Sequence, residues 1–356
     1  MSNGIYIHIP FCVKKCAYCD FNSYDNLDGL KQPYTEALLR EVAARLPAAY
    51  DTIFIGGGTP TALPAASLLR IVSAVAREGC EFTVEVNPAT LDRGGFAALK
   101  DAGVNRISFG LQSALEDELA VLGRIHTFAD FLRSYRDARD AGFGNISIDL
   151  MFSLPGQTLD KWKRTLHSAA ALSPEHLSCY SLTIEEGTPF HAMRLDLPSE
   201  EEDRQMYRYA AEYLQRLGYR HYEISNFARD GYQCAHNLKY WERTPYYGFG
   251  AGAHSLTGGT RYANSREVRQ YISANAVTET VLSATDIENE YIFLGLRKTD
   301  GIRLAEYRAL FGAEFTEKHA AALRNYQGLY AVDDGRFRLT LDGICVSNTI
   351  LCGLMT

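Results

Sequence analysis

Residues 12–19 read Cys-Val-Lys-Lys-Cys-Ala-Tyr-Cys, which places Cys12, Cys16 and Cys19 in a C-x3-C-x2-C spacing. They follow the apolar run Ile-Tyr-Ile-His-Ile at residues 5–9, which is typical of a buried strand. Thiolates are the usual ligands of iron–sulfur clusters, and so short a spacing lets one loop wrap a cubane. Three ligands for four irons leave one iron open, so the amine and carboxylate of an amino acid could chelate it.

Two plainer interpretations of the three cysteines remain open. A structural zinc site would need a fourth ligand, which His8 or Asp20 could supply, and cysteines without any metal are the other alternative. The other five cysteines are scattered along the chain, so they do not form the pattern of a disulfide framework. The N-terminus has no basic region followed by an apolar one. We therefore expect a cytoplasmic protein whose thiols stay reduced.

The composition disfavours two classes of partner. The chain has 356 residues, 36 Lys+Arg against 43 Asp+Glu, and a formal net charge of −7. This balance disfavours a nucleic-acid partner. No apolar stretch reaches the length of about 18 residues that a membrane-spanning helix needs, so no membrane span is expected.

The first half of the chain alternates short β-rich runs with longer helical patterns, which is typical of βα units around a parallel sheet. Six such units with right-handed crossovers would curl into a partial, TIM-like (βα)6 barrel. We expect this α/β core to span residues 1–225, with strands at residues 5–9, 52–55, 81–86, 106–109, 145–150 and 176–183.

The rest of the chain divides into two further parts. Residues 226–285 are rich in aromatic residues and glycine, and we expect them to form an irregular linking segment. Residues 286–356 show helical patterns, a hairpin near Asp333-Asp334-Gly335 and a final helix. This order predicts a C-terminal, winged-helix-like α+β domain.

Glycine and polar residues follow the predicted strands, where a barrel of this kind has its active site. Residues 56–60 read Gly-Gly-Gly-Thr-Pro, and glycine lets backbone amides approach a ligand closely. Glu85 ends the third strand, Gln112 follows the fourth and Asp149 lies at the end of the fifth. We therefore expect these residues to lie at the mouth of the barrel, although Glu85 and Asp149 could instead cap helices or form ion pairs in loops.

The cysteine motif and the Gly-Gly-Gly-Thr-Pro loop resemble those of the radical-SAM superfamily, whose members bind a [4Fe-4S] cluster and S-adenosylmethionine. The resemblance spans nearly the whole chain and implies a radical-SAM barrel. It implies that Cys12, Cys16 and Cys19 ligate the cluster. It also implies contacts to S-adenosylmethionine from eight residues, which are Tyr6, Gly57, Gly58, Thr59, Glu85, Gln112, Arg124 and Asp149.

Within that superfamily the sequence is similar to the branch that holds oxygen-independent coproporphyrinogen III oxidases and related heme chaperones. The oxidases usually have a further cysteine two residues after the third, where this chain has Phe21. The chain instead has His-Asn-Leu-Lys-Tyr-Trp at residues 236–241, which matches the H-N-x-x-Y-W motif of the chaperones.

This resemblance implies heme binding, with contact from His236, and delivery of heme to acceptor proteins that the sequence does not identify. An imidazole is a common axial ligand of heme, although a hydrogen-bonded loop histidine is the plainer interpretation of His236. An oxidase that abstracts hydrogen from coproporphyrinogen, or another radical-SAM enzyme, is the alternative. The sequence assigns no catalytic residue, and it leaves open the electron donor and whether S-adenosylmethionine is cleaved.

Overall fold

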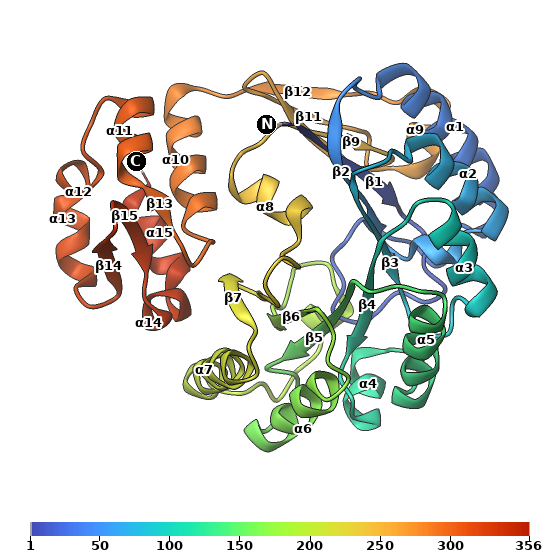
Figure 1. Cartoon of the computed structure of the whole chain (residues 1–356), viewed down its shortest axis with the longest axis horizontal. Helices are drawn as coiled ribbons and strands as arrows, with labels where there is room; N and C mark the ends of the chain where they lie inside the picture. Colours follow the sequence, from blue (N-terminus) through green and yellow to red (C-terminus); the bar gives the residue numbers. More distant parts are fainter. Residues whose placement is uncertain (1, 356) are drawn as a thin grey trace.

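The computed structural model describes residues 2–355 and shows a partial barrel beside a smaller C-terminal domain (Figure 1). Six parallel strands pair in chain order and are covered by helices on their outer side. This confirms the predicted (βα)6 core. The strands are β1 (Asn3–Ile9), β2 (Tyr50–Gly57), β3 (Glu81–Val86), β4 (Arg106–Gln112), β5 (Ile146–Phe152) and β6 (His176–Ser181).

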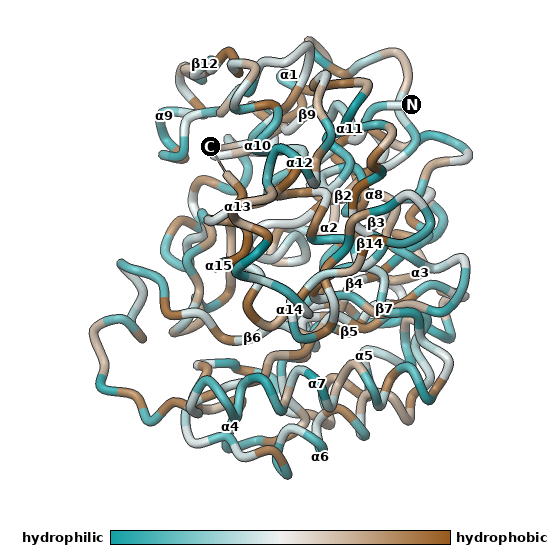
Figure 2. Tube along the Cα trace, turned by 90° about the vertical axis from the view of Figure 1, so that its left-hand side faces the viewer, coloured by the Kyte–Doolittle hydropathy of each residue, from teal (hydrophilic) through white to brown (hydrophobic). Residues whose placement is uncertain are grey.

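The covering helices alternate with the strands along the chain. Several begin at a residue whose side chain caps the helix, such as Thr127 and Ser199, which each form a capping box. Hydrophilic and hydrophobic residues alternate along α6 and α7 (Figure 2), and their buried side includes Trp162 and Met206. The helices are α1 (Lys31–Arg45), α2 (Ala65–Val75), α3 (Arg93–Asp101), α4 (Glu116–Leu122), α5 (Phe128–Asp140), α6 (Leu159–Ala170) and α7 (Glu200–Arg216).

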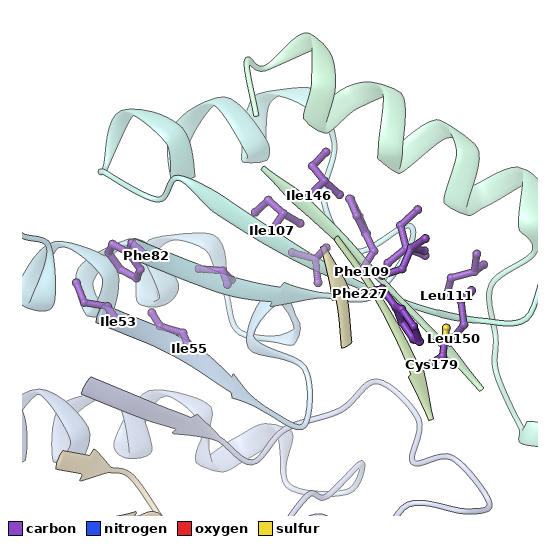
Figure 3. Packing of buried hydrophobic residues seen from close by; sticks show 14 of the residues in the cluster. Ile53, Ile55, Phe82, Ile107, Phe109, Leu111, Ile146, Leu150, Cys179 and Phe227 are labelled. Atoms are coloured by element: carbon purple, nitrogen blue, oxygen red, sulfur yellow. The ribbon is translucent and has the colours of Figure 1, made fainter. Parts of the chain in front are cut away.

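The core consists of apolar side chains from neighbouring strands of the barrel. Ile53, Phe82, Ile107 and Ile148 are fully or almost fully buried, and Figure 3 shows such side chains from β2 to β6 packed together. Burying each large apolar side chain contributes about 1.5–3 kcal/mol. The strands are thereby held in one register, and the loops after them open at the same end of the barrel.

The segment at residues 226–285 is not irregular, so that expectation was wrong. β9 (Tyr246–Phe249) extends the barrel sheet by pairing in parallel with β1. β10 (His254–Thr257), β11 (Thr260–Ala263) and β12 (Thr278–Val281) follow in antiparallel order. A side chain at Gly248 would place its Cβ only 2.0 Å from the His254 carbonyl oxygen. The glycine is therefore needed for strand pairing rather than for a flexible loop.

Two short strands extend the other edge of the sheet, and two short helices complete this part of the chain. β7 (Arg220–Glu223) and β8 (Asn226–Ala228) pair antiparallel beyond β6, and α8 (Ala235–Trp241) and α9 (Val268–Ala274) are short helices. Among the described residues the sheet ends at β12 and β7, so the barrel is open. The exact domain boundaries near residues 225 and 285 stay predictions.

The C-terminal domain has helices before and after a hairpin, as the sequence predicts. β14 (Tyr330–Asp333) and β15 (Arg336–Leu339) form the hairpin, and β13 (Ile302–Arg303) pairs with β15. The helices are α10 (Ala284–Gly295), α11 (Leu304–Phe311), α12 (Phe315–Lys318), α13 (Ala320–Leu323), α14 (Leu341–Cys345) and α15 (Ser347–Leu354). Within residues 2–355, no helix combines the length and the apolar character that crossing a membrane requires.

Candidate functional site

The cysteine loop leaves the end of β1 and is tied back on itself by backbone hydrogen bonds. The Cys12 amide donates to the Tyr24 carbonyl at 2.9 Å, and the Tyr24 amide donates to the Pro10 carbonyl at 2.8 Å. The Lys15 ammonium donates to the carbonyls of Phe21 and Ser23, each at 3.0 Å. These contacts fix a loop that has neither helix nor strand around its cysteines, so the three sulfur atoms share one cavity.

Each thiol has a polar group next to its sulfur. Thr59 Oγ1 donates to Cys12 Sγ at 3.8 Å, and Arg124 Nη1 donates to Cys16 Sγ at 3.5 Å. Ser23 Oγ lies 3.7 Å from Cys19 Sγ. Hydrogen-bond donors and a guanidinium stabilise thiolates, the form that binds metals. The surroundings of the three sulfurs therefore suit metal ligation.

The three thiols do not surround a single ion position. Within the described part of the chain, no three His, Cys, Asp or Glu side chains are placed to hold one metal ion. A zinc ion draws its sulfur ligands to about 2.3 Å from one point, and the loop as folded offers no such site. In a cubane, each cysteine instead binds a different iron.

The cavity that the cysteines line has a volume of about 340 Å³ and lies at the carboxyl ends of the barrel strands. Every residue that the sequence predicts to bind the cluster, S-adenosylmethionine or heme lines this cavity, except Tyr6 and His236. The predicted residues that it brings together are Cys12, Cys16, Cys19, Gly57, Gly58, Thr59, Glu85, Gln112, Arg124 and Asp149.

The glycine run after β2 allows a close approach of backbone to the cysteine loop. A Cβ atom at Gly58 would lie 3.0 Å from Cys12 Sγ and 2.7 Å from the Phe11 carbonyl oxygen. Gly57 has a φ of 115°, which side chains other than glycine rarely tolerate. The Gly58 amide donates to the Ile9 carbonyl at 2.8 Å. A larger residue at Gly58 would therefore displace a cluster ligand.

Glu85 and Asp149 are two carboxylates inside the cavity that form no ion pair among the described residues, although the charge of Arg106 acts on both. Burial, together with repulsion from Asp149, raises the pKa of Glu85 to about 8. Burial also raises the pKa of Asp149, which accepts hydrogen bonds from Ser108 at 3.1 and 3.3 Å. A bound cation would compensate these charges. The sulfonium and ammonium groups of S-adenosylmethionine supply two, so the donor set fits that cofactor.

The guanidinium of Arg124 donates most of its hydrogen bonds to other groups of the protein. Its Nη2 donates to Asn87 Oδ1 at 2.6 Å and to the Gly110 carbonyl at 2.5 Å, while Nη1 faces Cys16. Nε is buried without a hydrogen-bond partner among the described residues. Arg124 thus links β4 to the cysteine loop, and its contact with a cofactor carboxylate stays a prediction.

Sequence reasoning missed Asn87 as a member of this site. Its amide nitrogen donates to Thr59 Oγ1 at 2.7 Å, and its oxygen accepts from Arg124. It therefore joins the side chains next to Cys12 and Cys16. The Asn-Pro pair was evident as a loop after β3, but an amide that bridges two other polar residues has no motif of its own.

Tyr6 lies beside the cysteine cavity rather than in it. It lines an adjoining cavity of about 400 Å³ that shares Phe21, Gly57 and Glu85 with the first. Its hydroxyl is 2.9 Å from His8 Nδ1, and its ring stacks on Phe54. Contact between Tyr6 and S-adenosylmethionine stays a prediction.

His236 is buried in the protein and does not reach the cysteine cavity. Its Nδ1 is 2.9 Å from Thr52 Oγ1, and its Nε2 is 2.9 Å from Tyr240 Oη. Its ring is 1% exposed and stacks on Phe54. Burial lowers the pKa of His236 to about 3. Both ring nitrogens have partners, so heme contact by His236 would require α8 to open.

Two family patterns match this chain. That of the radical SAM superfamily covers residues 6–169, and that of the HemN C-terminal domain covers residues 282–346. The solved structure of coproporphyrinogen III oxidase (HemN) from Escherichia coli aligns with a TM-score of 0.85 over 99% of this chain and 90% of that chain. At 24% identity, this similarity concerns the fold. The open barrel and its three-cysteine cavity define a radical S-adenosylmethionine protein, with sites for a [4Fe-4S] cluster and S-adenosylmethionine.

Curated relatives define the family more narrowly. The chain is 39% identical to the heme chaperone HemW of Bacillus subtilis over 97% of both chains. It is 40% identical to HemW of Escherichia coli over 70% of this chain and 69% of that one. The chain therefore belongs to the HemW family.

Proposed function

We propose that this chain is a heme chaperone, which binds heme and passes it to acceptor proteins while holding a [4Fe-4S] cluster and an exchangeable S-adenosylmethionine. The observation that carries the proposal is the similarity to a heme chaperone over 97% of both chains. The acceptor proteins and any electron donor are partners whose identity the sequence does not give. Because the clustered thiols must stay reduced to bind iron, we propose a cytoplasmic location.

The residues of the cavity have distinct tasks in this proposal. When bound, the cluster supplies a redox-active centre with one iron open to a small ligand. Cys12, Cys16 and Cys19 hold it at the barrel end. Glu85 and Asp149 balance the positive charge of the cofactor, and the glycine run brings backbone groups close to it. The small volume of the cavity, about 340 Å³, limits what else can bind there.

An oxidase acting on coproporphyrinogen III is the second candidate, favoured by the shared fold with HemN. Phe21 argues against an oxidase, because the oxidases usually have a cysteine at this position of the motif. The Phe21 side chain lines the mouth of the cavity and is 63% exposed. It therefore offers apolar surface there instead of another thiol.

One experiment separates the two candidates. The protein is reconstituted under anaerobic conditions and supplied with reductant, S-adenosylmethionine and either coproporphyrinogen III or heme. We expect uptake of heme in a fixed ratio to protein, followed by transfer to the apo-form of a b-type heme protein, without porphyrin conversion. Turnover of coproporphyrinogen III, or no heme uptake, would contradict the proposal.

A further inference from the structure

A second and larger cavity, of about 880 Å³, lies between the barrel and the C-terminal domain. β7 and α8 form one wall, while α10, β13, the start of α11 and β15 form the other. It shares no lining residue with the cysteine cavity. In Figure 1, α8 lies between the barrel and α10. Ligand sites typically occupy about 300–1,000 Å³, so this cavity is large enough for a macrocycle.

Backbone and side-chain hydrogen bonds join the two walls of the cavity. The turn after α10 is bound to β7 through the Thr299 amide, which donates to the Tyr222 carbonyl at 3.2 Å. Thr299 Oγ1 also donates to the His221 carbonyl at 2.8 Å, and the Ile224 amide donates to the Arg297 carbonyl at 2.9 Å. These hydrogen bonds join the two walls next to the cavity, which Tyr222 lines.

The lining combines flat and apolar side chains from both walls. Leu238 and Trp241 come from α8, and Tyr291 and Ile302 come from the C-terminal domain. The Arg297 guanidinium lies 4.8 Å from the Trp241 ring centroid. Trp241 Nε1 is buried without a hydrogen-bond partner among the described residues. These side chains form an apolar part of a cavity that is also lined by charged residues, the carboxylates among them being Glu242, Asp300 and Glu306. A flat apolar ligand would pack against the aromatic part.

Cations also line the cavity, and two of them are free to bind anions. Arg220 pairs with Asp300 at 2.8 Å, and Lys298 pairs with Glu242 at 3.2 Å. Arg303 and Arg336 have no carboxylate partner within the described residues, and Arg336 donates only to a backbone carbonyl, at 3.3 Å. An arginine fork binds a carboxylate with two parallel hydrogen bonds. Two such arginines match a ligand with two carboxylates.

We propose that this interdomain cavity is where the protein holds heme, with the macrocycle against Trp241 and the two propionates near Arg303 and Arg336. The inference rests on the proposed function and adds a location to it. Among the described residues that line the cavity there is no His, Cys or Met. Tyr222 and Tyr291 line it, and a tyrosine can ligate heme iron, so a tyrosine is the ligand that this lining would offer to a heme held here.

The same placement divides the H-N-x-x-Y-W motif between two tasks. The motif lies on α8, whose His236 points into the barrel and bonds to Thr52, while Trp241 lines the interdomain cavity. His236 is then a positioning residue that anchors α8, and Trp241 is the residue that touches the ligand.

The test is a heme titration of the full chain, reconstituted with its cluster and followed by Soret absorbance. The double variant Arg303→Glu/Arg336→Glu should raise the dissociation constant about tenfold or more, with iron content unchanged. Arg324→Glu is the matched control, because Arg324 is an exposed arginine of the same domain that does not line the cavity; it should bind heme like the parent. Trp241→Ala tests the apolar wall independently and should also weaken binding.

Three outcomes would overturn the inference, and only the last of them also contradicts the proposed function. If the parent chain binds heme and the double variant binds it equally well, the location is wrong and the proposed function stands. The same holds if only Leu182→Glu, at the mouth of the cysteine cavity, weakens binding. If the parent chain binds no heme, the proposed function fails along with the location.

Discussion

At the scale of single residues, the site depends on polar side chains that touch the three sulfurs. Thr59 and Ser23 lie next to Cys12 and Cys19, and Arg124 lies next to Cys16. The neutral thiols are half-buried or buried, and burial raises the pKa of Cys12 and of Cys19. Such thiols need iron to become thiolates, so the cluster and the loop depend on each other.

Replacing Cys16 by Ser should abolish the cluster. A serine hydroxyl is a poor iron ligand, and the two remaining cysteines cannot retain a cubane on their own. The measurement is visible absorbance and iron content after anaerobic reconstitution. Cys352→Ser is the control, since Cys352 is exposed and lies outside the cavity. A full iron complement in the Cys16 variant would contradict the ligand assignment.

Binding of S-adenosylmethionine should tighten as the pH rises from about 6 to 8. The pKa of Glu85 is about 8 in the free protein, so the side chain is mostly neutral at the lower pH and increasingly charged above it. A cationic ligand prefers the charged form, and each pH unit is worth up to about tenfold in affinity. Isothermal titration across this range provides the measurement.

Glu85→Gln is the matched control for that pH dependence. The amide keeps the shape of the side chain but cannot ionise, so affinity should be low and nearly independent of pH. An unchanged pH profile in Glu85→Gln would show that another group is responsible.

Residue types with a defined chemistry could be predicted from the sequence, and residues that act through neighbours could not. The cysteines, Glu85 and Asp149 follow strands of a recognisable pattern, so their meeting in one cavity could be predicted. Asn87 bridges Thr59 and Arg124, and nothing in its local sequence indicates this. The direction in which His236 points depends on the packing of α8, which a motif does not specify.

At the scale of elements, α8 is held against the barrel by polar contacts to its first residues and to Lys239. Glu81, at the start of β3, accepts hydrogen bonds from the amides of Ala235 and His236, each at 3.0 Å. Lys239 pairs with Asp51 at 2.7 Å. These contacts satisfy the first amides of the helix, which have no partner within it. The helix is therefore short but fixed.

Replacing His236 by Ala should destabilise the protein by about 1–3 kcal/mol, because it removes a buried ring and leaves Thr52 and Tyr240 without a partner. Thermal unfolding followed by circular dichroism is the measurement, and the melting temperature should fall while iron content is retained. His191→Ala is the control, since His191 is exposed. Loss of heme binding with an unchanged melting temperature would identify His236 as a heme ligand instead.

The elements of the barrel were predictable because their pattern is strong, and those of residues 226–285 were not. The six parallel strands are apolar runs bounded by glycine and proline, with a helix after each. β9 to β12 have only four residues each, and their aromatic and glycine content resembles that of a loop. Pairing of β9 with β1 depends on a neighbour more than 200 residues away in the chain, which local patterns do not reveal.

At the scale of the whole molecule, we propose that two separate cavities bind the two ligands, S-adenosylmethionine and heme. The cysteine cavity opens at the end of the barrel, and the interdomain cavity lies between β7, α8 and the C-terminal domain. The sequence predicted both domains, but a cavity between them depends on how the two pack.

A hydrogen-bonded path joins the two cavities. Ser147 lies 3.4 Å from Asp149 and 2.8 Å from His176, whose other nitrogen lies 2.8 Å from the Tyr222 hydroxyl.

Mössbauer spectroscopy of the anaerobically reconstituted full chain, recorded with and without S-adenosylmethionine, tests the central claim most directly. We predict about four irons per chain as a cubane, with the signal of about one iron in four changing when S-adenosylmethionine is added. A protein that takes up zinc alone, takes up no iron, or shows a cubane spectrum unaffected by S-adenosylmethionine would contradict the account.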